Sequence, residues 1–317
     1  MNQSFWKDAS VLITGGSGFV GRWVGRALAP TGARLHVMDL QPPRRLEVPF
    51  EFTTVDLVDL SATRAAIAAL GPDVIIHLAG QPGVESSRLD PIGAFASNVT
   101  ATLHLLEACR LEGSPSALVA VSSNHVYGSQ HVTPTREGAP LNGDGTYATS
   151  KLCGDVIART YGKGYGVPVG IARITNSFGG DDHHSNHIVT ASIHSALRGQ
   201  APVIKRSGRD VKGYLYVKDT VAGLLALAEG VARDPDLHGE AFNFVPDRPI
   251  SVLELVREVL AVVDLDVEPE VREPGAAHET EHLDHSMARE SLDWAPHYSL
   301  REALQETVQW YRDHLGS

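Results

Sequence analysis

A tyrosine and a lysine stand four residues apart in the segment Tyr147-Ala148-Thr149-Ser150-Lys151. Residues four apart share one face of a helix, so we expect the ammonium of Lys151 to lie near the phenol of Tyr147 and to lower its pKa. Tyrosine has an ordinary pKa of about 10, and a nearby cation makes it useful as a base around neutrality. The pair therefore predicts a site that removes a proton from a hydroxyl group.

Two serines, Ser122 and Ser123, end an apolar run that is typical of a buried strand. Ligands of open α/β sheets bind at the carboxyl ends of the strands, where a serine hydroxyl can hydrogen-bond the oxygen on which Tyr147 acts. A Tyr–Lys pair of this spacing also arises by chance on many helices. Its combination with strand-end serines and with a glycine-rich loop favours the catalytic interpretation.

That loop, Thr14-Gly15-Gly16-Ser17-Gly18-Phe19-Val20-Gly21, follows the first apolar run directly. Gly15 would make the tight turn, Gly18 would let the backbone approach a pyrophosphate, and Gly21 would allow close packing of helix on strand. The helix N-terminus would supply free N–H donors, with Phe19 and Val20 beside the ligand. The loop therefore predicts a bound dinucleotide.

Asp39 closes the second apolar run, 18 residues after Gly21. A carboxylate there accepts hydrogen bonds from the adenosine ribose and repels a 2′-phosphate, which favours NAD over NADP. Asp56 follows the third run, and two interpretations stay open for it: contact with the adenine amino group, or a helix cap. We expect Leu57 in the same cofactor pocket.

The elements that must position these residues are short apolar runs alternating with helical patterns. The expected strands are 11–14, 35–38, 52–55, 74–77, 118–122 and 169–172. The expected helices are 20–29, 61–70, 91–110, 147–165, 252–263 and 300–315. This alternation predicts an α/β fold, a Rossmann-type doubly wound parallel sheet with a smaller, discontinuous α/β lobe. We expect an NAD-binding domain at 1–175, rejoined by about 213–245, and a substrate-binding lobe at 176–212 and 246–317.

The composition excludes several classes of protein. The 317 residues include 27 Lys and Arg against 38 Asp and Glu, for a net charge of −11. An acidic chain has no basic face for nucleic acid or an anionic membrane. Its two cysteines cannot build a disulfide framework. No signal peptide or membrane span is visible, so we expect a cytoplasmic protein.

Longer motifs resemble the extended short-chain dehydrogenase/reductases, and among them the NAD-dependent nucleotide-sugar epimerase/dehydratase family. They are TGGSGFVG at 14–21, HLAGQPGVESS at 77–87, SNV at 97–99, SSNHVYG at 122–128, YATSK at 147–151, ARITNSFGG at 172–180, YLYVKD at 214–219 and LDWAPHYSLREALQETVQWY at 292–311. The resemblance covers nearly the whole chain. It is much more specific for the family than for the substrate.

The resemblance implies a role for individual residues. Tyr147 would deprotonate a sugar hydroxyl, usually at C4, while the C4 hydride passes to NAD; Lys151 would bind the nicotinamide ribose, and Ser123 would complete the triad. The other implied positions are Leu78, Ala79, Gly80, Asn98 and Ser122 around the cofactor and Asn176 at the substrate diphosphate. The family also implies a homodimer that forms through helices 91–110 and 147–163.

Departures from the family pattern bear on the outcome of the reaction. Many 4,6-dehydratases carry acids at the two positions after the catalytic serine or threonine, where this chain has Asn124 and His125. Asparagine cannot carry a proton at neutral pH; His125 can serve as an acid or base, or simply pack there. Lys212 replaces the arginine that usually clamps the diphosphate, and Arg209 is a possible substitute.

We therefore expect a nucleotide-sugar epimerase that acts through a 4-keto sugar, with C4 as the expected carbon of inversion. The alternatives are a CDP-glucose-like 4,6-dehydratase, a C2-epimerase, a 4-keto reductase and a non-catalytic NAD-binding sensor. One polar loop holds acids and histidines that could suit a metal, but the chemistry needs none, and we expect a substrate-contacting or solvated loop. Its residues are Asp181, Asp182, His183, His184 and His187.

Overall fold

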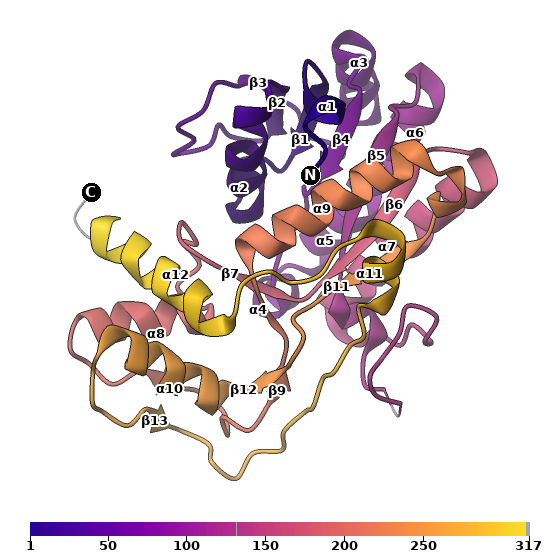
Figure 1. The fold of residues 1–317 in the computed structure, drawn as a ribbon. Coiled ribbons are helices and arrows are strands. Elements are labelled where there is room, and N and C mark those ends of the chain that lie inside the picture. Colours follow the sequence, from indigo (N-terminus) through magenta and orange to yellow (C-terminus); the bar gives the residue numbers. More distant parts are fainter. Residues whose placement is uncertain (131, 315–317) are drawn as a thin grey trace.

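The computed structural model describes residues 1–130 and 132–314. At its centre is a seven-stranded sheet in the order β11-β6-β5-β4-β1-β2-β3, with every neighbouring pair parallel (Figure 1). The strands are β1 Ser10–Thr14, β2 Arg34–Asp39, β3 Glu51–Thr54, β4 Val74–His77, β5 Ala117–Ser123, β6 Val169–Ile174 and β11 Ala241–Phe244. The predicted doubly wound parallel sheet is confirmed.

Helices cover both faces of this sheet. Val11 and Ile13 of β1 pack on one side with α2 and α9, whereas Leu12 between them packs on the other side with α3, α6 and α7. The first side holds α1 Gln3–Trp6, α2 Phe19–Leu28, α9 Val217–Arg233 and α11 Ser286–Leu292. The second side holds α3 Leu60–Leu70, α6 Ala101–Glu112 and α7 Gly145–Tyr165. Because the strands are buried on both faces, they read as continuous apolar runs in the sequence.

One predicted helix is different in the structure. The segment expected as a single helix over 91–110 is α5 Pro91–Phe95, then one π-helical turn over Ala96–Thr100, then α6. α4 Val84–Leu89 precedes it. A π turn inserts an extra residue into a helix and often marks a functional site. Here it contains Asn98, which is buried against the sheet edge.

A second group of helices lies beyond the carboxyl edge of the sheet. α8 Ile188–Leu197, α10 Val252–Val263 and α12 Leu300–His314 pack together, with short strand pairs beside them (Figure 1). The pairs are β7 Asn176–Phe178 with β10 Tyr214–Tyr216, β9 Val211–Lys212 with β12 Ile250–Ser251, and β8 Val203–Ile204 with β13 Glu270–Val271. The predicted helix 252–263 is present and opens with the Ser251–Glu254 capping box. Residue 315, the expected end of the last helix, lies outside the described residues.

Two features of the helices bear on the sequence predictions. Neither α8 nor α9 is among the predicted helices, although the buried positions of both helices recur at helical spacing. Among the described residues, no helix is both long and apolar enough to cross a membrane.

Candidate active site

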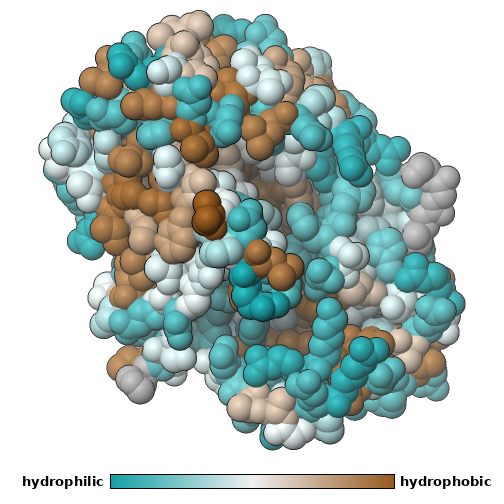
Figure 2. All heavy atoms as spheres, turned by 180° about the vertical axis from the view of Figure 1, so that it is seen from behind, coloured by the Kyte–Doolittle hydropathy of each residue, from teal (hydrophilic) through white to brown (hydrophobic). Residues whose placement is uncertain are grey.

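A cavity of about 1190 Å³ opens at the carboxyl edge of the sheet. Figure 2 shows this side of the molecule hollowed between its upper and lower parts. The cavity brings together the following predicted site residues: Gly15, Gly18, Phe19, Val20, Gly21, Asp39, Asp56, Leu57, Leu78, Ala79, Gly80, Asn98, Ser122, Ser123, Asn124, His125, Tyr147, Lys151, Asn176 and Lys212. Arg209 is not among its lining residues.

The glycine loop forms one wall of the cavity, and its geometry leaves no room for side chains. Gly15 has φ +67°, and a Cβ there would lie 2.5 Å from the backbone nitrogen of Ala79. A Cβ on Gly21 would lie 2.6 Å from the Cα of Gly16. Gly18 caps α2 without any side-chain hydrogen bond to the first N–H groups of the helix. This close backbone cradle with free donors fits a pyrophosphate.

Two aspartates follow the glycine loop along the same wall. Asp39 is the last residue of β2, and its carboxylate accepts hydrogen bonds from the backbone N–H groups of Ser17 at 3.1 Å and Leu40 at 2.7 Å. The Asp56 carboxylate accepts from the N–H of Val58 at 2.9 Å. Asp56 therefore makes a local turn and also lines the cavity, while Asp59 rather than Asp56 caps α3.

Tyr147 and Ser123 meet at the centre of the cavity. Burial raises the pKa of Tyr147, and the hydrogen bond with Ser123 lowers it only in part. Lys151 donates from Nζ to the Val121 carbonyl oxygen at 2.5 Å. Burial lowers the pKa of Lys151 to about 8, against the opposing attraction of Asp155. The expected lowering of the Tyr147 pKa by Lys151 is thus absent from this arrangement, because burial dominates and the ammonium is bonded to backbone.

The two strand-end serines have different surroundings. Successive side chains of a strand point to opposite faces. Ser123 contacts Tyr147, whereas the hydroxyl of Ser122 donates to Asp155 Oδ2 at 2.8 Å. Asp155 also holds the buried guanidinium of Arg173 at 2.9 Å. Ser122 therefore belongs to a buried polar network that supports the site from behind.

Asn98 connects the π turn to the loop that follows β4. Its amide accepts from the backbone N–H of Gln81 at 3.0 Å and donates to the hydroxyl of Ser150 at 2.9 Å. A Cβ on Gly80 would lie 2.4 Å from Asn98 Oδ1. The extra residue of the π turn thus places the amide between the β4 loop and α7.

A glutamate that sequence reasoning missed lies behind Asn124. The amide of Asn124 donates to Glu281 Oε2, and Asn124 Oδ1 accepts from the Ser123 hydroxyl at 3.2 Å. Glu281 also accepts from Thr175 Oγ1 at 3.4 Å. Burial raises the pKa of Glu281, although these hydrogen bonds and the charge of Lys212 oppose the shift. Glu281 comes from an irregular connector, and no local spacing signals its approach to Asn124.

His125 forms the next part of the wall. Its ring meets that of Tyr147 edge to face, with 5.6 Å between the centroids. Burial, followed by the charge of Lys212, lowers the pKa of His125 against the effect of Glu279. The imidazole is therefore held neutral at pH 7, which permits either packing or proton transfer.

The cations of the far wall differ from those expected. Lys212 lines the cavity, as predicted, but the guanidinium of Arg209 donates to the Ala276 carbonyl oxygen at 3.0 Å. Lys205 and Arg206, which sequence reasoning did not single out, line the cavity instead. The side-chain amide of Asn176 donates to the Gly213 carbonyl oxygen at 3.0 Å. The site therefore has a cationic wall opposite the glycine loop.

The chain matches a known protein family. The family described as "NAD dependent epimerase/dehydratase family" matches residues 11–244. The chain is 31% identical to a UDP-glucose 4-epimerase of Mycolicibacterium smegmatis, over 95% of this chain and 98% of the relative. It is 27% identical to a CDP-glucose 4,6-dehydratase of Salmonella typhimurium, over 98% and 93%.

The structure also superposes on solved structures of an epimerase and of a dehydratase. A UDP-glucose 4-epimerase of Thermotoga maritima with UDP-glucose superposes with a TM-score of 0.87 at 27% identity, over 96% of this chain and 99% of that one. The dTDP-glucose 4,6-dehydratase DesIV of Streptomyces venezuelae, solved with NAD bound, has a TM-score of 0.84 at 25% identity, over 96% and 98%.

Proposed function

Because this chain belongs to the NAD-dependent epimerase/dehydratase family, we propose that it epimerises a nucleotide-linked sugar at C4 through a transient 4-keto sugar. The observation that carries the choice of epimerisation is Asn124. An amide follows Ser123 where dehydratases of the family carry an acid, and both ends of that amide are hydrogen-bonded, to Ser123 and Glu281. No proton donor therefore stands at this position to assist the loss of water.

NAD is the cofactor of the family, and the residues present here suit it. The backbone cradle of Gly15, Gly18 and Gly21 would hold the pyrophosphate, and Asp39 would receive the adenosine ribose hydroxyls. When bound, NAD accepts a hydride from the sugar carbon and returns it. The chain's own task is to orient the sugar and to move the proton of its hydroxyl group.

Tyr147 would take that proton, and Ser123 would hold the same oxygen through its hydroxyl group. In the present arrangement the Ser123 hydroxyl donates to Asn124 Oδ1, and it would turn from that oxygen to the sugar oxygen when a substrate binds. Lys151, with a pKa of about 8, is still largely protonated at neutral pH and can turn from the Val121 carbonyl to a ribose hydroxyl beside Tyr147. That movement would supply the positive charge that Tyr147 lacks in the present arrangement.

The substrate end lies across the cavity. Asn176 and Lys212 would contact the diphosphate of the nucleotide sugar, with Lys205 and Arg206 adding positive charge. With these contacts, the proposed NAD-binding part comprises residues 1–175 and about 213–245. The proposed substrate-binding part comprises residues 176–212 and 246–317. Arg209 bonds to a backbone carbonyl and is not part of the proposal.

The reaction in deuterated water tests the proposal. Purified protein is incubated with UDP-, CDP-, GDP- and dTDP-linked hexoses, and the products are analysed by NMR. We expect a C4 epimer without deuterium on carbon, since the hydride returns to the carbon it left. A 4-keto-6-deoxy product with deuterium at C5 would overturn the proposal in favour of dehydration.

A 4,6-dehydratase is the second candidate, because one observation favours it. Glu281 places a buried carboxyl with a raised pKa against Asn124. Such a group keeps its proton to a higher pH than an exposed carboxyl does. It does not line the cavity, so its contact with a substrate would require Asn124 to move aside.

We also propose a homodimer through α5, α6 and α7. Leu89, Ile92 and Val156 are 71%, 83% and 45% exposed on or beside these helices. Large apolar side chains left this exposed on neighbouring helices are typical of protein interfaces. Light scattering of the wild type and of Ile92→Asp tests this, with a dimer expected for the first and a monomer for the second; a monomeric wild type would contradict it.

A further inference from the structure

The loop before α8 brings three possible metal ligands together. Asp182 Oδ1 lies 2.8 Å from His184 Nδ1, and Asp182 Oδ2 lies 2.6 Å from His187 Nδ1. One ligand atom from each of the three residues lies within 4.8 Å of the other two. Both imidazoles thus present the same nitrogen to one carboxylate, and their rings stack with centroids 4.7 Å apart.

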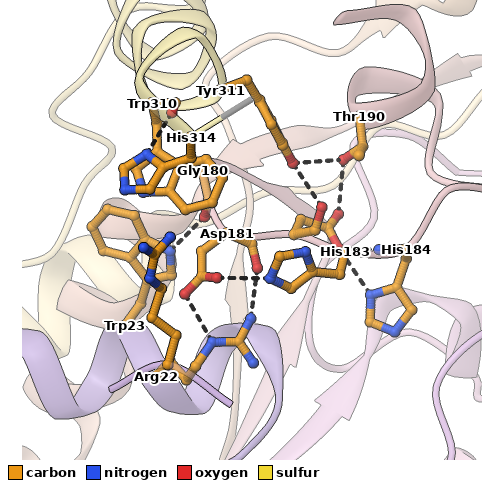
Figure 3. A network of polar contacts seen from close by, with 12 residues as sticks. Arg22, Trp23, Gly180, Asp181, His183, His184, Thr190, Trp310, Tyr311 and His314 are labelled. Atoms are coloured by element: carbon orange, nitrogen blue, oxygen red, sulfur yellow. Dashed lines mark hydrogen bonds and ion pairs between the residues drawn. The ribbon is translucent and has the colours of Figure 1, made fainter. Parts of the chain in front are cut away.

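The carboxylate at the centre of this group is held firmly. The side chain of Asp182 is 1% exposed, and Thr190 Oγ1 donates to its Oδ2 at 3.1 Å. The hydroxyl of Tyr311, from α12, donates to the Asp182 carbonyl oxygen at 2.7 Å (Figure 3). Such outer contacts orient a metal ligand and are part of a metal site.

The rest of the loop is fixed by a separate carboxylate. Asp181 accepts from Arg22 at 2.8 Å and from Arg26 at 2.7 Å, both on α2. His183 donates to Asp181 at 3.0 Å, so its ring points toward Asp181 (Figure 3). The three ligands therefore stand on a loop that is anchored to α2 and α12, while the histidine between them belongs to another contact.

We propose that Asp182, His184 and His187 bind a divalent transition-metal ion of the zinc class. Two imidazoles and one carboxylate are a ligand set that zinc uses when it keeps a position open for water or a ligand. Both histidines line the large cavity and are about half exposed, so the ion has an entry path and its open position faces the cavity. This site is independent of the proposed epimerisation, in which no step uses a metal.

Binding a metal ion requires the two imidazoles to adjust their positions. Ligand atoms about 2.0–2.1 Å from a tetrahedral zinc lie roughly 3.3 Å apart. The two hydrogen-bonded nitrogen–oxygen distances, which run to different oxygens of Asp182, must therefore widen by several tenths of an ångström. Ligand atoms that are farther apart than this, up to 4.8 Å, must move closer, and the half-exposed histidines can do both by rotating about their side-chain bonds. Each imidazole then gives its Nδ1 lone pair to the metal, and its proton moves to Nε2 or to solvent.

Calorimetric titration with ZnCl2, on full-length protein first dialysed against a chelator, tests the site. We expect one zinc ion per chain in the wild type and at least a tenfold weaker affinity in His184→Ala and His187→Ala. His183→Ala is the matched control, because it removes a histidine from the same loop without touching Asp182, and it should bind zinc as the wild type does. Co²⁺ absorption spectra of the same variants report the coordination geometry.

Two results would overturn the proposal. One is a wild type that binds no more zinc than the His184→Ala/His187→Ala double variant. The other is a His183→Ala variant that loses as much affinity as the single ligand variants. Circular dichroism establishes that each variant is folded, and His187→Gln replaces any alanine variant that is not. Tyr147→Phe should bind zinc normally, so failure of the epimerase proposal and failure of the metal proposal are distinguishable.

Discussion

The two walls of the cavity are built in different ways. The cofactor wall consists of backbone at the ends of β1, β2 and β4, with Gly15 packed so closely that a Cβ would lie 2.5 Å from Ala79. The substrate wall carries side-chain charge on two-residue strands and loops, including Lys205, Arg206 and Lys212. Close backbone contact tolerates no substitution, whereas charge can be supplied from several neighbouring positions.

The relatives of this chain belong to one NAD-dependent family, yet one is a 4-epimerase and another a 4,6-dehydratase. The cofactor wall is specified by glycine spacing and by the register of a buried sheet. The substrate wall can exchange an arginine for a lysine, or move a cation along the chain, without disturbing the sheet. Substitutions on the two walls should therefore have different kinds of effect.

The largest effect is expected between the two walls, at Tyr147. Tyr147→Phe removes the proton acceptor and should lower kcat roughly 10³-fold, within the range ascribed to general acid–base groups. NAD content, measured by absorbance after denaturation, should stay near that of the wild type. Turnover within tenfold of the wild type would falsify the assignment of Tyr147 as the base.

Adding one methyl group at Gly15 should disrupt the packing of the cofactor wall. Gly15→Ala places a Cβ against the Ala79 backbone at a residue with φ +67°. We expect a loss of about 2–4 kcal/mol in unfolding free energy and loss of NAD from the purified protein. Gly138→Ala, where a Cβ meets nothing within 4 Å, is the control and should leave both measurements unchanged.

Lys151 should show a conflict between activity and stability. Its pKa of about 8, against an ordinary value of 10.5, means that the native state disfavours its charge. Lys151→Met should therefore raise the unfolding free energy at pH 7 by about 1–3 kcal/mol. It should also lower kcat, though by less than Tyr147→Phe does, because it removes the cation proposed to bind the nicotinamide ribose.

The pH dependence of that difference follows from linkage. Below pH 8 the ammonium is charged in both states, so the wild type bears the full burial penalty. Between pH 8 and 10.5 the native lysine loses its proton first, and the wild type gains stability relative to the variant. Denaturant unfolding of both proteins from pH 7 to 10.5 should show that the difference between their unfolding free energies shrinks. A difference that stays constant with pH would contradict the lowered pKa of Lys151.

On the substrate wall, a comparison of two variants tests whether Lys212 or Arg209 contacts the diphosphate. Lys212→Ala should raise KM for the nucleotide sugar about tenfold, because it removes a charge from the cavity. Arg209→Ala should change KM less than twofold, since Arg209 bonds to the Ala276 carbonyl outside the cavity. The reverse order in steady-state kinetics would reassign the diphosphate contact to Arg209.

The smallest effect is expected behind the substrate wall, at Glu281. Glu281→Gln keeps the size of the side chain but replaces the ionisable carboxyl that accepts a hydrogen bond from the Asn124 amide. We expect kcat to fall by a few fold at unchanged KM, with a change in the acid limb of the pH profile. Glu273→Gln, an exposed residue of the same connector, should match the wild type across that profile.

Much of the cofactor wall followed from local pattern. The glycine triplet, Asp39 at the end of β2, and the serines at the end of β5 were located because parallel strands bring their carboxyl ends to one edge. The capping box at Ser251 is equally local. The π turn at Asn98 was missed because its sequence has the same periodicity as the helix around it.

The sequence by itself determined the family, the sheet and the Tyr147–Lys151 spacing, since each depends on residues that are near neighbours or on strand register. The tertiary structure decided what those groups contact. Lys151 donates a hydrogen bond to the Val121 carbonyl oxygen, and Arg209 donates one to the Ala276 carbonyl oxygen. Asn124 donates one to Glu281, which lies 157 residues later in the chain. Contacts between distant segments depend on packing of the whole chain, and no local spacing encodes them.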